Sequence, residues 1–230
     1  FGHVMWCNTG QIAWLKTLYW QRCTAFWHLL SKVAGYGVSG LFLRRGLGIG
    51  VAGLTNGFAA DKWVIADPTL EGAIAAGTYF EFGVSVKTGF TVSLETLDLS
   101  LRRTAVNAPI YFELQASFDK FASPGITVDS FTYYGRTSGT APDPCPLDND
   151  PYYYMHSDLA GRGNTATSPG DPIPTVDLTA FPELQDIPGG TNVTFRLYAW
   201  GNEKTTPTNT VSFGRMQGPV ITGLSKPTSD

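Results

Sequence analysis

The chain has 230 residues, a formal net charge of −3 and only 15% charged residues, which excludes a globally basic nucleic-acid-binding protein. The 26 Gly and 15 Pro disfavour long helices and coiled coils and favour short strands joined by turns. No apolar run reaches the ~18 residues that a membrane-spanning helix needs, so the sequence predicts no membrane span.

Residues 1–37 form an apolar N-terminal segment. It holds four of the six Trp and contains no acid and no Pro. Its pattern allows either a helix over Thr9–Ser31 or two or three buried strands. Such a segment must be buried in its own domain or in a neighbouring copy. The candidate assembly residues are Trp14, Leu18, Trp20, Phe26 and Trp27.

The three cysteines, Cys7, Cys23 and Cys145, leave at least one thiol free or paired between chains. Cys7 and Cys23 can close a short loop, and the sequence leaves open whether they are bonded. Their spacing does not match a zinc site.

Residues 38–223 predict an all-β domain, an antiparallel sandwich of short strands separated by turn signals. The apolar alternation loses phase once, at Glu95–Thr96, which is typical of a β-bulge. The expected strands are Val38–Arg45, Thr78–Val86, Phe90–Leu101, Ile110–Phe118, Ile126–Tyr134, Asn192–Trp200, Thr210–Arg215 and Val220–Thr222.

Three further segments complete the chain. Gly48 to Gly53 satisfies GxGxxG, but turn-like residues follow it, so we interpret it as a glycine-rich turn or a close strand approach. Asp177–Gln185 predicts a single helical turn before the turn at Pro188. Residues 224–230 are a C-terminal tail.

The stretch 135–171 is rich in Pro, Asp, Gly, Ser and Thr and predicts a long loop. Asp148 and Asp150 are the first candidates for a calcium site there, against the alternative of solvated loop acids. No cofactor is required, and calcium is optional. Three consecutive tyrosines, Tyr152, Tyr153 and Tyr154, can form a sugar-stacking surface with Trp200, or cover the sandwich or a neighbouring subunit.

Arg196 lies between Phe195 and Leu197 in an alternating strand, so its side chain faces the other way. We expect it to pair with an acid of a neighbouring strand on the solvent face. The candidate carboxylates Glu81 and Glu95 also lie on expected strands, and no nucleophile elbow is present.

Residues 38–223 contain, in this order, Trp63 and the stretches 73–82, 89–94, 114–121, 176–179 and 193–201. This order of segments resembles a bacterial β-sandwich module found in exported proteins that carry a PEP-CTERM sorting signal. The resemblance implies a jelly-roll-like sandwich and an extracellular or cell-surface location, and it implies no established activity.

These observations predict a non-enzymatic, extracellular structural subunit that assembles with copies of itself into a filament, sheath or surface layer. Strand addition through residues 1–37 is the expected mode of assembly. The alternative is a secreted carbohydrate-binding module with a glycan as partner. Nucleic acid is not an expected partner.

Overall fold

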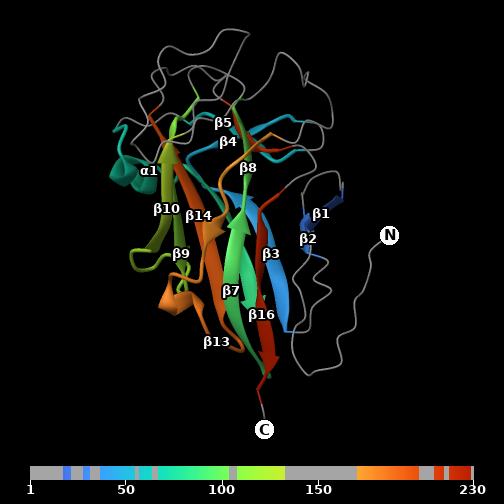
Figure 1. The fold of residues 1–230 in the computed structure, drawn as a ribbon. Helices are drawn as coiled ribbons and strands as arrows, with labels where there is room; N and C mark the ends of the chain where they lie inside the picture. Colours follow the sequence, from blue (N-terminus) through green and yellow to red (C-terminus); the bar gives the residue numbers. More distant parts are fainter. Residues whose placement is uncertain are drawn as a thin grey trace.

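The computed structural model describes residues 18–21, 28–31, 37–54, 57–63, 67–103, 108–132, 170–201, 210–214 and 218–228. Over these residues the protein is mostly β, with antiparallel sheets packed together and one short α-helix (Figure 1). The expectation of a mostly β chain with antiparallel sheets is therefore confirmed for these residues.

The first layer is a five-stranded sheet in the order β10-β9-β14-β6-β3, and every neighbouring pair is antiparallel. Its members are β3 (Val38–Arg45), β6 (Tyr79–Val86), β9 (Tyr111–Ser117), β10 (Ile126–Thr132) and β14 (Asn192–Trp200). The central strand β14 has the bounds that its period-two alternation predicts.

The second layer is organised around β7 (Phe90–Asp98) and β8 (Ser100–Arg103), which only Leu99 separates. On one side lie β15 (Val211–Phe213) and β16 (Val220–Pro227). On the other lie β11 (Asp171–Pro172), β12 (Val176–Asp177) and β13 (Ile187–Pro188). The hairpin β4 (Gly50–Ala52) and β5 (Ala59–Asp61) extends this layer beyond β15, and β4 is its edge.

The predicted bulge is present in β7. Thr96 pairs with Thr222 and Leu94 pairs with Gly223, so Glu95 is the extra residue. One additional residue restores the inward direction of the apolar side chains after the break in phase.

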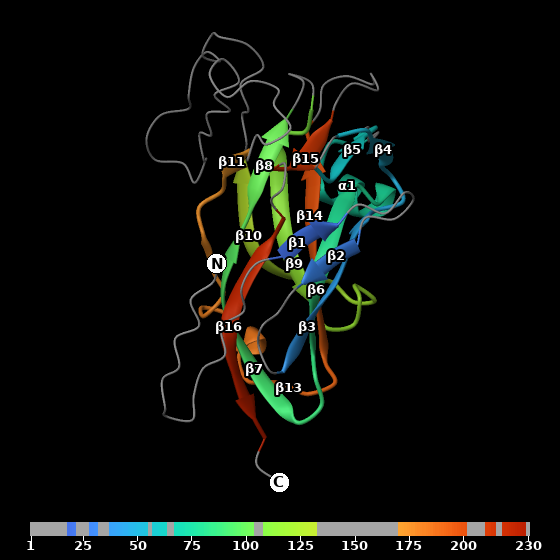
Figure 2. The same ribbon diagram turned by 90° about the vertical axis from the view of Figure 1, so that its right-hand side faces the viewer.

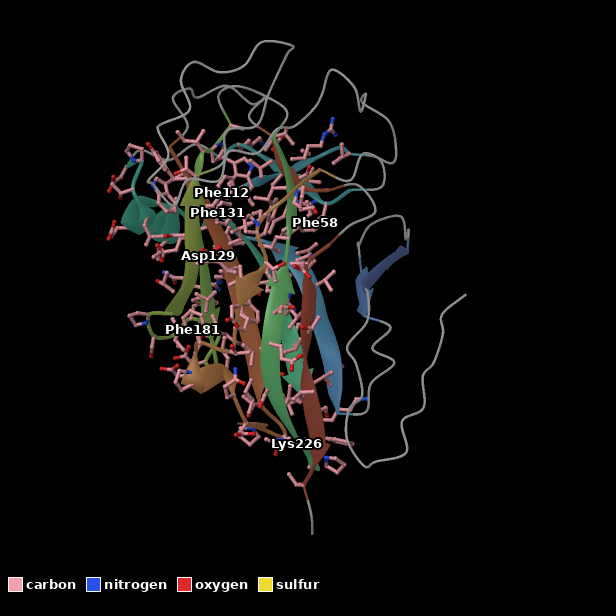
Figure 3. All side chains as sticks on the ribbon, viewed as in Figure 1. Phe58, Phe112, Asp129, Phe131, Phe181 and Lys226 are labelled. Atoms are coloured by element: carbon pink, nitrogen blue, oxygen red, sulfur yellow. The ribbon has the colours of Figure 1, made fainter. Side chains whose placement is uncertain are left out.

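Aromatic side chains join the two layers. The Phe213 ring of β15 lies 5.0 Å from the Phe80 ring and 6.1 Å from the Phe82 ring, both of β6. Farther along the core, Phe112 of β9 stacks on Phe131 of β10 at 5.3 Å (Figure 3). All five rings belong to the buried core and are at most 5% exposed. Hydrophobic burial is therefore the main source of stability.

Arg45 also connects the layers. Its Nε donates to the Ala59 carbonyl of β5 at 2.8 Å, and its guanidinium carbon lies 3.8 Å from the centroid of the Phe58 ring. Burial lowers the Arg45 pKa to about 10, while the nearby Asp61 carboxylate acts in the opposite direction. The side chain remains a cation at neutral pH.

Helix α1 (Leu70–Ala76) was not expected from the sequence. Thr69 caps its start by accepting from the Gly72 amide at 3.1 Å, and Gly77 ends it with φ of 70°. Side chains at Gly46 or Gly48 would overlap the backbone carbonyls of Gly77 and Ala76. Gly48, the first glycine of the GxGxxG string, therefore serves close backbone approach, and a strand, β4, begins inside the string where a nucleotide site would need a helix.

Two strands of the N-terminal segment are described, β1 (Leu18–Gln21) and β2 (His28–Ser31), paired as an antiparallel hairpin. Of the two readings of Thr9–Ser31, strands rather than a helix are present at Leu18–Gln21 and His28–Ser31. The hairpin lies beside β3, and β4, β5 and α1 lie at the end of the molecule opposite to β13 (Figure 2). The expected helical turn before Pro188 is present as a 3-10 helix, η1 (Pro182–Leu184).

Candidate binding face

The first layer has an outer face that carries polar and aromatic side chains. Along β14, Val193, Phe195, Leu197 and Ala199 enter the core. The alternate positions of β14 face outward, and the strand register places residues of β6 and β9 beside them. We call this set the outer face: Tyr79, Glu81, Tyr111, Glu113, Gln115, Asn192, Thr194, Arg196, Tyr198 and Trp200.

Arg196 is at the centre of the outer face. Its Nε donates to Glu81 Oε2 on β6 at 2.9 Å, and its Nη1 donates to the Tyr198 hydroxyl at 3.4 Å. The guanidinium carbon lies 4.1 Å from the Tyr79 ring centroid and 4.3 Å from the Phe121 ring centroid. The expected cross-strand ion pair of Arg196 is therefore confirmed, with Glu81 as the acid.

The titration behaviour follows from this packing. Burial raises the pKa of the Tyr79 and Tyr198 hydroxyls, and the Arg196 charge opposes the rise in both. For Arg196, burial acts to lower the pKa, but hydrogen bonds to Tyr198 and Glu81 outweigh it and the pKa is raised. Both tyrosines thus stay neutral and Arg196 stays charged around neutral pH.

The turn after β9 closes over this cluster. The Ser117 hydroxyl accepts from the Phe121 amide at 2.8 Å and donates to Asp119 Oδ1 at 2.8 Å. Asp119 Oδ2 accepts from the Ser123 amide at 3.0 Å, and its hydrogen bonds to Ser117 and Ser123 lower the pKa of Asp119. These bonds hold the Phe121 ring against Arg196 and against Tyr198, whose ring centroid lies 6.3 Å away.

Trp200 and Tyr111 form an aromatic pair at the other end of β14. Their ring centroids are 6.0 Å apart with 30° between the planes, and Tyr111 is 37% exposed. Gly201 follows with φ of 80°, and any side chain there would overlap the Tyr111 ring. The pair presents partly exposed ring surface beside the polar outer face.

A second polar row runs across β9 and β10. Glu113 Oε1 accepts from Gln115 Nε2 at 2.7 Å and from the Thr127 hydroxyl at 2.9 Å. The register aligns Gln115 with Arg196, so this row continues the Glu81–Arg196 pair across the sheet. The outer face therefore holds its polar groups in fixed positions, and Gln115, Thr194 and Tyr198 among them are at most 7% exposed.

A hollow of about 170 Å³ lies between β3, β6, β14 and the turn after β9. Its volume is below the ~300–1,000 Å³ of sites for drug-sized ligands, so it fits one small group rather than a whole oligomer. Leu41, Arg44, Glu81, Phe82, Lys120, Asn192 and Thr194 line it.

Most sites proposed from sequence lie outside the described residues. This is true of Asp148, Asp150, Tyr152, Tyr153 and Tyr154, and of Trp14, Phe26 and Trp27 in the N-terminal segment. Leu18 and Trp20 lie in β1, but their side chains are outside the description. These assignments stay predictions. Within the described part of the chain, no cluster of His, Cys, Asp and Glu suits a metal ion.

Sequence reasoning found Arg196 and Trp200 but missed the aromatic residues that surround them, Tyr79, Tyr111, Phe121 and Tyr198. The alternation in Asn192–Trp200 already places Arg196, Tyr198 and Trp200 on one face. Tyr79, Tyr111 and Phe121 come from other elements and need the strand register and the turn geometry.

Searches against protein-family models, curated proteins and solved structures found no match to this chain. Among the described residues, no helix is long and apolar enough to cross a membrane.

Proposed function

We propose that this chain is an exported jelly-roll domain without catalytic activity that binds carbohydrate on its outer face. The observation that carries the proposal is the combination, on one sheet face, of the Trp200–Tyr111 pair with fixed polar groups around Arg196. Sugars present apolar ring faces and polar edges, so aromatic surface with neighbouring hydrogen-bonding groups suits them.

The strand pairing supports the jelly-roll assignment. In a jelly roll, eight strands in chain order pair first with eighth, second with seventh, third with sixth and fourth with fifth. Here β5 pairs with β15, β6 with β14, the β7–β8 unit with β11, β12 and β13, and β9 with β10. In this scheme β15 and β16 together are the eighth strand, with an interruption between them. β3 is an additional edge strand beside β6.

The extracellular or cell-surface location rests on the resemblance of residues 38–223 to modules of exported proteins with PEP-CTERM signals. Calcium at Asp148 and Asp150 is not needed for the binding proposed here.

The test is glycan binding by the purified chain, first on a glycan array and then by calorimetry with the best ligand. Trp200→Ala and Tyr111→Ala should each weaken binding at least tenfold, since each removes ring surface from the contact. Phe118→Ala is the matched control, because Phe118 is similarly exposed at 38% but lies at the other end of β9. An array without a ligand above background refutes the proposal. Binding that depends on Tyr152, Tyr153 and Tyr154 but not on Trp200 would move the site to the loop.

Self-assembly into a filament, sheath or surface layer is the second candidate function, and one observation favours it. The edge strand β4 carries Val51 at 74% exposure, and Leu47 just before it is fully exposed at 101%. An edge strand with exposed apolar side chains is a template for pairing with another chain.

Light scattering and negative-stain microscopy of the native protein test this second function. Polymers that dissolve on deletion of residues 1–37 support strand exchange through the N-terminal segment. Polymers that survive the deletion but dissolve in Val51→Lys point to the β4 edge instead. A monomer at all concentrations refutes self-assembly.

A further inference from the structure

The hollow on the outer face has an uneven charge. Arg44 of β3 and Lys120 of the turn after β9 line it and are both exposed, and the acid that lines it is Glu81. In the part of the chain that the structure describes, the one ion pair is that of Glu81 with Arg196, so Arg44 and Lys120 are not in ion pairs. Because Arg196 neutralises Glu81, the hollow presents an excess of positive charge.

Asp119, next to Lys120 in the chain, is an anion but does not line the hollow. Its two carboxylate oxygens accept from the Ser117 hydroxyl and the Ser123 amide. A cationic hollow on a chain with a net charge of −3 is a local feature rather than a consequence of overall composition.

From this geometry we infer that the hollow binds the acidic group of an acidic polysaccharide, either the carboxylate of a uronic acid or a sulfate ester. The inference rests on the proposed glycan binding and adds the class of sugar. Arg44 and Lys120 supply the charge, while the Asn192 amide and the Thr194 hydroxyl supply neutral hydrogen bonds for the adjoining sugar hydroxyls.

The backbone at Lys120 is fixed at some cost. Lys120 and Phe121 have φ values of 62° and 64°, in the left-handed region that side chains other than Gly, Asn and Asp seldom occupy. The Ser117 hydroxyl holds this turn through the Phe121 amide. Strain of this kind is retained where the surrounding structure enforces it, and here it brings the Lys120 cation to the rim of the hollow.

The hollow and the aromatic pair lie on one strand. Thr194 lines the hollow and Trp200 ends β14, so they are about 20 Å apart at the ordinary rise of an extended strand. A polysaccharide running along β14 can therefore place one acidic unit in the hollow and another unit against Trp200 and Tyr111.

The test compares polygalacturonate, dextran sulfate and neutral dextran as ligands of the full chain, by calorimetry at low and at moderate salt. The variants are Arg44→Gln and Lys120→Asn, the latter chosen because Asn tolerates the left-handed backbone. Lys226→Gln is the matched control, since Lys226 is an exposed cation on β16 in the other layer (Figure 3).

We expect acidic ligands to bind more tightly than dextran and to weaken with salt. Each single variant should lower the affinity about two- to fivefold and the double variant about tenfold, as exposed charge contacts do. The better of the two acidic ligands identifies the carboxylate or the sulfate as the group bound.

Equal binding of dextran and the acidic ligands, unchanged in the variants, overturns the acidic-sugar inference but leaves the proposed function standing. An equal loss in Lys226→Gln also overturns it, because the effect is then one of overall charge. No binding of any glycan, here or on the array, overturns both.

Discussion

Replacement of Arg196 by Ala should destabilise the fold although Arg196 is on the outer face. The variant removes the ion pair with Glu81 at 2.9 Å and two ring contacts, with Tyr79 at 4.1 Å and Phe121 at 4.3 Å. The side chains of Arg196 and Glu81 are each only 18% exposed, so water replaces these contacts incompletely.

The magnitude follows from these contacts. An ion pair near the surface contributes about 0.2–1 kcal/mol, and each cation–π contact contributes about 0.5–1 kcal/mol. The loss of all three, with Glu81 left without its partner, corresponds to roughly 2–3 kcal/mol. For a chain of this size that lowers the Tm by about 5–10 °C.

Urea unfolding followed by tryptophan fluorescence measures the change. Arg196→Lys keeps the charge but loses the planar guanidinium, so we expect about half of the loss. Arg44→Ala is the control on the same cross-strand row, and it should change stability by no more than about 0.5 kcal/mol because Arg44 is exposed.

A double-mutant cycle with Glu81→Gln separates the ion pair from the ring contacts. A loss below about 0.5 kcal/mol for Arg196→Ala would refute the reasoning. A full loss in Arg196→Ala with none in Arg196→Lys would show that charge alone matters and that the ring contacts contribute nothing.

Three further predictions test other parts of the structure. Gly83→Ala should lower the free energy of unfolding in urea by about 1–3 kcal/mol, because its Cβ would overlap the Val193 carbonyl. Gly53→Ala, with open space around it, should leave the free energy of unfolding unchanged. Equal effects of the two variants would contradict the close approach of β6 and β14. Burial raises the Tyr198 pKa, so the contribution of this hydroxyl to stability is complete below pH 10.0 and is lost as pH rises through the pKa of the folded state. Tyr198→Phe should therefore lose less stability at alkaline pH in a pH series. An identical slope for the variant and the parent protein would contradict this. Burial also raises the pKa of Asp129, which lies at the edge of the core beside Phe131 (Figure 3). Asp129→Asn should therefore raise the Tm at pH 7 but give no gain below pH 3.8, where the carboxyl is protonated in the folded and the unfolded state. A gain in Tm at both pH values would point to a cause other than charge burial.

The long strands were predictable from the sequence because one buried face imposes period-two alternation. Asn192–Trp200 was predicted with the observed bounds, and the bulge at Glu95 followed from a single break in phase. Strands of two or three residues, such as β11 and β13, are too short to carry a period and were missed.

Helix α1 was missed for a different reason. Its seven residues make barely two turns, too few for a helical period to stand out. The capping signals were nevertheless present, Thr69 before the helix and Gly77 after it.

The outer face illustrates what alternation alone does not provide. Arg196 was expected to meet a cross-strand acid, but Glu81 as the partner depends on the register of β6 against β14, which separates the two residues by 115 positions in the chain. Phe121 reaches Arg196 only because a hydroxyl at Ser117 holds a left-handed turn. The composition of the long loop led to Tyr152, Tyr153 and Tyr154 as the expected sugar surface. The aromatic residues that the structure places around Arg196 and Trp200 come instead from four separate elements: β6, β9, the turn after β9 and β14.

The two proposed functions use different surfaces, so they do not compete. Glycan binding uses the outer face of the first layer, while the exposed Val51 and Leu47 lie at the β4 edge of the second layer. A surface layer that also binds an acidic polysaccharide would need both. Val51→Lys should then abolish assembly and leave the affinity for polygalacturonate unchanged, and Trp200→Ala should do the reverse. If either variant changed both properties, one surface would serve both functions, and the assignment of assembly to the β4 edge would be wrong.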